Sequence, residues 1–222
     1  MSKRRLKFSK TGLGKYISHL DLLRTFTRSI TRANLPVKYS NGFNPHQIIT
    51  FSLPLPVGVT SETEFVDIDF DDSSKNSDIM NQLNQNLPPD IKILAIGEPK
   101  WSANDITSAL YSVTIVASQN IPRDSVSAFF AQDEISAIKK TKKGEKEVNL
   151  RDFTEDATIV ESDKNHLKMS LTLSAGGTKS IKPDILIKKL EEYLCLGEFD
   201  EVYIHRQKIY YTELCVLKEA YC

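Results

Sequence analysis

The order in which hydrophobic periodicity changes along the chain constrains its fold more than any other feature. In the first half we expect a strand at 4–9, a helix at 19–34, a strand at 64–70, a helix at 79–87 and a strand at 91–96. Either 37–39 or 47–52 supplies the second strand. The resulting order, strand-helix-strand-strand-helix-strand, is that of the split βαβ or ferredoxin-like arrangement.

The same order recurs after a linker that contains Pro99 and Asn104-Asp105. We expect strands at 110–117, 134–140, 145–150, 158–161, 167–174 and 201–212, with helices opened by Pro122 and Pro183. The predicted fold class is therefore α+β: two ferredoxin-like subdomains, each an antiparallel sheet with its helices on one face. The predicted boundaries are 1–98 for the N-terminal domain, with basic loops, and 107–222 for a decorated C-terminal domain.

Composition indicates a protein without membrane segments. There is no run of about 18 apolar residues, and no apolar segment follows the charged start, so we expect a cytoplasmic chain without a secretory signal. The three cysteines (Cys195, Cys215 and Cys222) lack the close spacing of a disulfide framework or a zinc site. We therefore expect no metal site and no cofactor.

Charge is distributed unevenly, although the whole chain has 29 basic and 29 acidic residues. Residues 1–50 hold ten Lys or Arg against one acid, a net charge of +9, whereas residues 51–99 hold two against nine, a net charge of −7. One interpretation is an anion-binding face in the first segment. The other is a basic strand that lies beside an acidic strand and neutralises it.

Three groups of residues that could bind a ligand or transfer a proton lie in the first part of the basic segment, residues 1–50. The run Lys-Thr-Gly-Leu-Gly-Lys at 10–15, called the glycine turn below, either cradles phosphate with Lys10 and Lys15 or is a turn that needs glycine. Arg24, Arg28 and Arg32 recur every fourth residue, as a phosphate-binding stripe or a solvated helix face. His19 follows Ser18, the predicted N-cap with Asp21 as its capping-box partner, and is either an acid–base group or a local hydrogen-bond partner.

The run Tyr-Ser-Asn-Gly-Phe-Asn-Pro-His at 39–46, called the aromatic loop below, contains two turn signals. A plain hairpin would need only Asn41-Gly42. Rings amid basic residues are typical of sites that hold single-stranded RNA bases. The candidate substrate- or anion-binding residues are thus Lys10, Lys15, His19, Arg24, Arg28, Tyr39, Asn41, Phe43, Asn44 and His46.

A second group of lysines, at 139, 140, 142, 143 and 146, crowds the predicted hairpin of the second half. These lysines either touch phosphate or protect an edge strand from aggregation, and the protective role is the commoner one.

The glycine turn with Ser-His-Leu-Asp-Leu at 18–22, the aromatic loop, and Pro-Leu-Pro-Val-Gly at 54–58 together resemble the radical SAM-linked, or radical SAM-associated, protein family. Weaker signatures follow at 146–152 and 176–183, with Lys182-Pro183 where that family leads us to expect Arg-Pro. That family is a domain of unknown function, found fused behind a cobalamin-type radical SAM enzyme or as a separate chain beside one. The resemblance implies a radical SAM enzyme as partner and supplies no reaction.

Cysteine spacing decides which part of that chemistry the chain could carry. A radical SAM cluster is usually bound by Cys-x3-Cys-x2-Cys, and Cys195, Cys215 and Cys222 do not have this spacing. The first hypothesis is therefore a non-catalytic partner that presents or recognises a substrate, with RNA as the expected one. The alternative is a metal-independent endoribonuclease with His19 or His46 as its acid or base, and a third option is a protein-binding scaffold. Both of the first two place the site in the early loops, which we expect to fold together into one positive pocket at the start of the helix 19–34.

Overall fold

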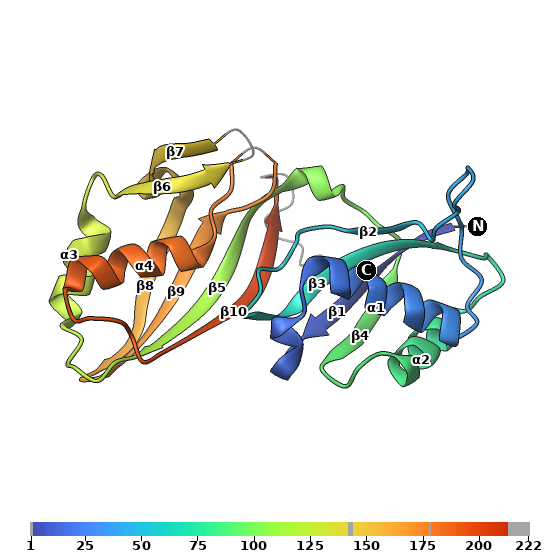
Figure 1. Ribbon diagram of the computed structural model, residues 1–222, viewed down its shortest axis with the longest axis horizontal. Coiled ribbons are helices and arrows are strands. Elements are labelled where there is room, and N and C mark those ends of the chain that lie inside the picture. Colours follow the sequence, from blue (N-terminus) through green and yellow to red (C-terminus); the bar gives the residue numbers. More distant parts are fainter. Residues whose placement is uncertain (1, 142–143, 178, 213–222) are drawn as a thin grey trace. The chain divides into compact units, whose positions relative to one another are not determined.

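The computed structural model describes residues 2–141, 144–177 and 179–212, which divide into two compact units. Unit 1 comprises the described residues up to Ile106 together with Tyr211 and Thr212, and unit 2 is Thr107–Tyr210. This division places the linker with unit 1. Each unit is described by itself (Figure 1).

Unit 1 is an antiparallel sheet with two helices on one face (Figure 1). Its strands lie in the order β4-β1-β3-β2, which is the ferredoxin-like order. The elements are β1 (Ser2–Lys10), α1 (His19–Arg32), β2 (Ile49–Phe51), β3 (Val59–Phe70), α2 (Asn76–Asn86) and β4 (Ile91–Gly97), with short 3₁₀ helices at Gly12–Tyr16 (η1) and Ala103–Asp105 (η2).

The core of unit 1 lies between the sheet and its helices. Alternate residues of β1 and β3 and one stripe of each helix are buried together, because side chains repeat every two positions on a strand and about every 3.6 on a helix. Phe51 completes the core from β2, with ring-centroid distances of 5.9 Å to Phe8 and 5.4 Å to Phe26. The buried side chains include Leu6, Phe8, Leu22, Phe26, Ile30, Val66, Ile68, Ile79 and Leu83.

Local chemistry sets the ends of α1. Ser18 Oγ accepts a hydrogen bond from the Asp21 N–H at 3.2 Å, which confirms the predicted N-cap. At the other end Asn34 has φ of 50°, a left-handed conformation that ends a helix. The helix therefore ends at Arg32, two residues before the predicted end.

Unit 2 repeats the arrangement with an inserted hairpin. Its main sheet has the order β10-β5-β9-β8, again ferredoxin-like, and β6 and β7 form a separate two-stranded sheet. The elements are β5 (Ile106–Val116), α3 (Arg123–Ala131), β6 (Ser136–Thr141), β7 (Gly144–Asn149), a 3₁₀ helix at Leu150–Phe153 (η3), β8 (Thr154–Asp163), β9 (His166–Ser174), α4 (Pro183–Leu194) and β10 (Glu201–Tyr211).

The predicted α+β fold class is confirmed. The second strand of unit 1, left open between two segments, lies within 47–52, while 37–39 contributes only isolated bridges at Val37 and Tyr39. Strand β8 is ten residues long, more than twice the predicted length, since its polar residues hide the strand pattern. Lys142 and Lys143 of the predicted hairpin tip lie outside the described residues. None of the described helices is both long and apolar enough to cross a membrane.

Candidate functional site

The glycine turn wraps around a carboxylate of the same chain. The Gly14 N–H donates to Asp90 Oδ2 at 3.1 Å, and the Thr11 N–H donates to the Asp90 carbonyl at 2.9 Å. A Cβ at Gly12, where φ is 50°, would lie 2.5 Å from Asp90 Oδ1. The turn therefore needs glycine for its conformation and for close approach, and Asp90 occupies the place that a phosphate would take.

The two lysines of this turn differ in exposure. Lys10 is 1 % exposed, and its Nζ donates to the Ile17 carbonyl at 2.8 Å. This corrects the expectation that Lys10 is presented to a ligand, because its ammonium group holds the segment that leads into α1. Lys15 is half-buried, with its Nζ 5.1 Å from the centre of the Tyr16 ring, and its carbonyl accepts from the Gly58 N–H at 2.9 Å.

The start of α1 already holds a negative charge. Asp21 Oδ2 accepts from Ser18 Oγ at 2.7 Å, and Asp21 Oδ1 accepts from Arg24 Nη1 at 2.9 Å. These two contacts, the Ser18 bond first, lower the pKa of Asp21 below 3.8. Because a carboxylate favours the positive end of a helix dipole, Asp21 fills the place expected for a bound anion.

The three arginines of α1 do not act as one stripe. Arg24 forms the exposed ion pair with Asp21, and Arg32 donates to the Asn86 carbonyl at the end of α2. Arg28 is exposed, and the structure gives it no partner among the described residues. Of the predicted stripe, Arg28 is therefore the residue whose guanidinium is open to a ligand.

His19 packs on the core rather than on another polar group. Its ring lies edge-on to Phe51, with 5.3 Å between ring centroids, and the rest of the side chain is exposed. Phe51 in turn touches the two buried phenylalanines of β1 and α1. The position of His19 at the start of α1 therefore follows from apolar packing of β2 against α1.

The aromatic loop is closed at its base by a network of hydrogen bonds. The Ser40 N–H donates to the His46 carbonyl at 2.8 Å, and Ser40 Oγ lies 2.8 Å from His46 Nδ1 and accepts from the His46 N–H at 3.1 Å. Below this closure Tyr39 and Gln47 form a β-bridge. The loop is thus held as a hairpin, which was the simpler of its two interpretations.

The tip of this loop presents its side chains to solvent. Phe43 is fully exposed, at 105 %, and Tyr39 is 49 % exposed. Asn41 and Asn44 are also exposed. Gly42, with φ of 122°, allows the sharp turn between them, and no atom lies within 4 Å of the place where its Cβ would be. Two rings and two amides of this loop are therefore exposed to solvent.

Gln47, which sequence reasoning missed, fixes the loop on α1. Its Nε2 donates to Thr31 Oγ1 at 3.1 Å and to the Tyr39 hydroxyl at 3.4 Å, and its side chain is 6 % exposed. Asp90 was missed as well. Neither position carries a sequence signal, since each acts through contacts with residues that are distant in the sequence.

The predicted residues form two groups, at opposite ends of α1. Thr31, which holds the aromatic loop through Gln47, lies 12 positions after His19, and a rise of 1.5 Å per residue places them about 18 Å apart. The expectation of a single pocket is therefore wrong. Lys15 and His19 lie at the helix start, whereas Tyr39, Phe43 and His46 lie beyond its far end, because 47–51 runs along the helix between them.

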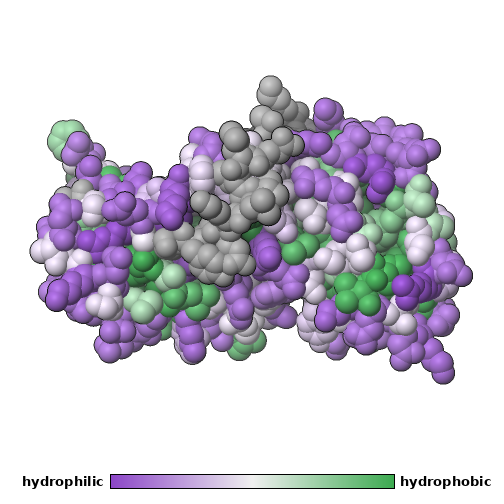
Figure 2. All heavy atoms as spheres, turned by 180° about the vertical axis from the view of Figure 1, so that it is seen from behind, coloured by the Kyte–Doolittle hydropathy of each residue, from purple (hydrophilic) through white to green (hydrophobic). Residues whose placement is uncertain are grey.

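The uneven charge of the sequence is partly neutralised within the sheet. Arg5, 4 % exposed, binds both carboxylate oxygens of Asp67, at 2.8 and 2.9 Å, and Lys3 lies opposite Asp69 in the same β1–β3 register. Basic and acidic strands thus lie side by side. Figure 2 shows one face of the molecule, where hydrophilic residues predominate with hydrophobic ones between them.

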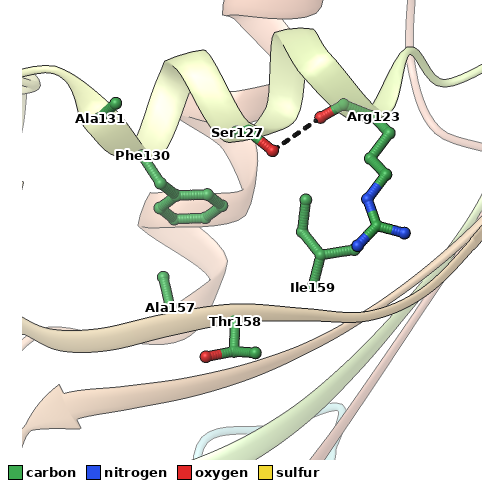
Figure 3. Close-up of a pocket in the computed structure, with 7 residues that line it drawn as sticks. All are labelled: Arg123, Ser127, Phe130, Ala131, Ala157, Thr158 and Ile159. Carbon is green, nitrogen blue, oxygen red and sulfur yellow. Dashed lines mark hydrogen bonds between the residues drawn. The ribbon is translucent and has the colours of Figure 1, made fainter.

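A separate depression lies in unit 2, between α3 and β8. Its volume is about 460 Å³, and Figure 3 shows Phe130 of α3 facing β8 across it. Ser127 Oγ, at its rim, donates to the Arg123 carbonyl at 3.1 Å. None of the predicted site residues lines it. The lining residues are Arg123, Ser127, Phe130, Ala131, Ala157, Thr158 and Ile159.

Within the described part of the chain, no group of three or more His, Cys, Asp or Glu side chains is placed to hold a metal ion. The two histidines named as acid–base candidates also lie in the two separate groups. His46 contacts Ser40 and His19 contacts Phe51, so they do not form a pair.

Residues 3–183 match a family described as an uncharacterized protein conserved in bacteria (DUF2344). The chain belongs to this family. The match covers both weaker sequence signatures as well as the glycine turn and the aromatic loop. No curated protein matches the chain in sequence.

Solved structures show where the fold occurs elsewhere. A chain of a Cbf5-Nop10-Gar1 complex superposes with a TM-score of 0.54 at 10 % identity, over 93 % of this chain and 48 % of that one. A chain of an H/ACA RNP bound to a substrate RNA containing 2'-deoxyuridine gives 0.51 at 10 % identity, over 91 % and 46 %. The protein thus spans about half the length of these structural neighbours, and the likeness is one of fold.

Proposed function

We propose that this protein binds single-stranded RNA through the aromatic loop and serves as a non-catalytic partner of a radical SAM enzyme, to which it presents the RNA. The observation that carries the proposal is the full exposure of Phe43 on a loop whose base is fixed by hydrogen bonds. A phenyl ring held in water does nothing for the fold, whereas it provides a stacking surface for an unpaired base.

The surroundings of Phe43 suit such a ligand. Tyr39 offers a second ring, and the amides of Asn41 and Asn44 can bond the edges of an unstacked base. Arg28, on the same helix face as Thr31, and the exposed Lys38 supply positive charge for the phosphates on either side. Base stacking, edge recognition and backbone contact thus come from one small area of unit 1.

The comparisons support the RNA part of the proposal by analogy of fold. The neighbours' own descriptions name a Cbf5-Nop10-Gar1 complex and an H/ACA RNP with a substrate RNA. The radical SAM part depends on the sequence resemblance and on the cysteine spacing, which cannot hold the cluster. The endoribonuclease alternative gains no observation, because its two histidines lie at opposite ends of α1.

The direct test is binding of fluorescein-labelled single-stranded RNA, measured by fluorescence anisotropy. We expect Phe43→Ala to weaken binding about 5- to 150-fold, because base–aromatic stacking contributes about 1–3 kcal/mol. The matched control is Tyr16→Ala, which removes a 61 % exposed ring of the same unit from the other end of α1. Equal affinity of Phe43→Ala and the native protein would overturn the proposed site.

The partner is tested separately, by mixing the protein with a radical SAM enzyme of the same organism and measuring co-elution in size-exclusion chromatography. Co-elution is expected with and without RNA. Separate elution at micromolar concentrations would remove the radical SAM part of the proposal, and the RNA part would stand on its own test.

A further inference from the structure

Two lysines of the β6–β7 hairpin face each other on one side of the ribbon. Lys139 pairs directly with Lys146 in the antiparallel register, so their Cβ atoms lie about 5 Å apart. Ala137 and Val148 are the next pair on that same side, and Ala137 is buried, so this side faces the body of unit 2. Like charges in such a pair are destabilising, although charges that point inward are also one way in which an edge strand is protected from aggregation.

A third lysine joins them through the ring of Phe153. Lys139 Nζ lies 5.2 Å from the centre of this ring, and Lys179 Nζ lies 5.8 Å from it. Lys139 Nζ also donates to the Ser180 carbonyl at 2.5 Å, which fixes the hairpin to the segment that precedes α4. Two ammonium groups, those of Lys139 and Lys179, therefore lie at one phenyl ring, with Lys146 opposite Lys139 on the neighbouring strand.

These charges are not balanced locally. The structure gives none of the three lysines a carboxylate partner among the described residues. The nearby Gly177 has φ of 44°, and a Cβ built there would meet no atom within 4 Å. The cluster thus borders open space. Two ammonium groups on neighbouring strands repel each other, and an arrangement that breaks a local rule in this way is typical of a functional site.

We propose that Lys139, Lys146 and Lys179, called the lysine cluster below, bind the phosphate backbone of RNA and give unit 2 an RNA contact of its own. This inference rests on the proposed function. Lysine binds phosphate as a point charge, and ammonium groups spread over an open surface suit a chain of phosphodiesters. A small phosphorylated ligand would call for a concave site, and the lysine cluster lies outside the depression between α3 and β8.

The test is the salt dependence of RNA binding for Lys146→Gln, Lys179→Gln and the double variant. Each change should weaken binding about twofold to fivefold, equally for all sequences, and reduce the slope of log K against log[salt] by about 0.7. Lys139 stays in place because its ammonium holds Ser180. The control is Lys188→Gln with Lys208→Gln, two exposed lysines of the same unit.

The outcomes separate this inference from the proposed function. If the double variant keeps the slope of the control, the lysine cluster does not bind RNA and the inference is overturned. If Phe43→Ala binds as the native protein does while the double variant loses slope, the aromatic loop fails and the lysine cluster stands.

A second probe covers the remaining case, in which native protein binds no RNA. Titration with pyrophosphate, followed through the NMR signals of the lysine side chains, then shows whether Lys146 and Lys179 bind a free phosphate ligand. Selective shifts without RNA binding would overturn both the RNA assignment and the proposed function.

Discussion

The glycine turn and the aromatic loop are both rich in glycine and polar residues, but the turn is filled by its own chain and the loop is open to solvent. Both combine glycine with polar side chains, both belong to the basic residues 1–50, and both adjoin α1. The glycine turn is filled by Asp90, and Lys10 is buried, whereas the aromatic loop leaves Phe43 wholly exposed. The difference shows that site-like residues can serve the fold alone, and that a ligand site also requires groups left without an intrachain partner.

The largest expected effect comes from adding a single methyl group to one glycine of each segment and comparing the loss of stability. Gly12→Ala should destabilise the protein by about 2–3 kcal/mol, because the new Cβ would lie 2.5 Å from Asp90 Oδ1 at a left-handed φ. Gly42→Ala, in open space, should cost about 1 kcal/mol, from backbone strain alone. Urea unfolding of both variants measures the difference.

A double variant sharpens this result. In an Asp90→Ala background the clash is absent, so Gly12→Ala should cost clearly less than in the native protein. An equal cost in both backgrounds would show that Asp90 does not fill the turn.

Lys10→Met should cost about 1–3 kcal/mol, because it removes the buried donor to the Ile17 carbonyl. RNA affinity of the folded variant should stay unchanged. Lys15→Met, at the more exposed lysine of the turn, should change stability by less than about 0.5 kcal/mol. If Lys10→Met lost RNA binding but kept native stability, this prediction would be wrong and Lys10 would contact the ligand.

Asp21 should make a small, pH-dependent contribution at the start of α1. Its pKa in the folded state is below the 3.8 of the unfolded chain, so its stabilisation is present above about pH 3.8 and is lost as the pH falls further. Asp21→Asn should therefore be less stable than the native protein at pH 7 and equally stable at pH 2. Urea midpoints at the two pH values test this; a constant difference would contradict it.

The smallest expected effect concerns the aromatic loop itself. Phe43→Ala should change the free energy of unfolding by less than about 0.5 kcal/mol, because the ring makes no buried contact. Thermal unfolding beside the native protein measures it. A larger loss would mean that Phe43 serves the fold, which would weaken the argument for a ligand.

The sequence was a good guide wherever a signal is local. Ser18 and Asp21 predict the start of α1, and the alternation in 64–70 predicts β3, because caps and strand periods depend on near neighbours. The repeated element order predicted the ferredoxin-like topology of both units for the same reason.

The sequence was a poor guide to which charged groups are open to a ligand. Lys10, Arg24 and Arg32 were candidates for phosphate, and each is held by a carbonyl or carboxylate of the same chain. The contact of Lys139 with Phe153 carried no sequence signal either. These outcomes depend on how each side chain is oriented and buried, with partners that lie between 3 residues away, for Arg24, and 54 residues away, for Arg32.

By itself, the sequence determined the α+β class, the element order, the cap of α1 and the spacing of the cysteines, since these follow from periodicity and from neighbouring side chains. Only the tertiary structure decided that the early loops lie at opposite ends of α1, that Asp90 fills the glycine turn, and that Lys139 and Lys179 meet at Phe153. The physical reason is that hydrogen bonds and charge contacts act over a few ångströms, and the fold decides which distant residues come that close.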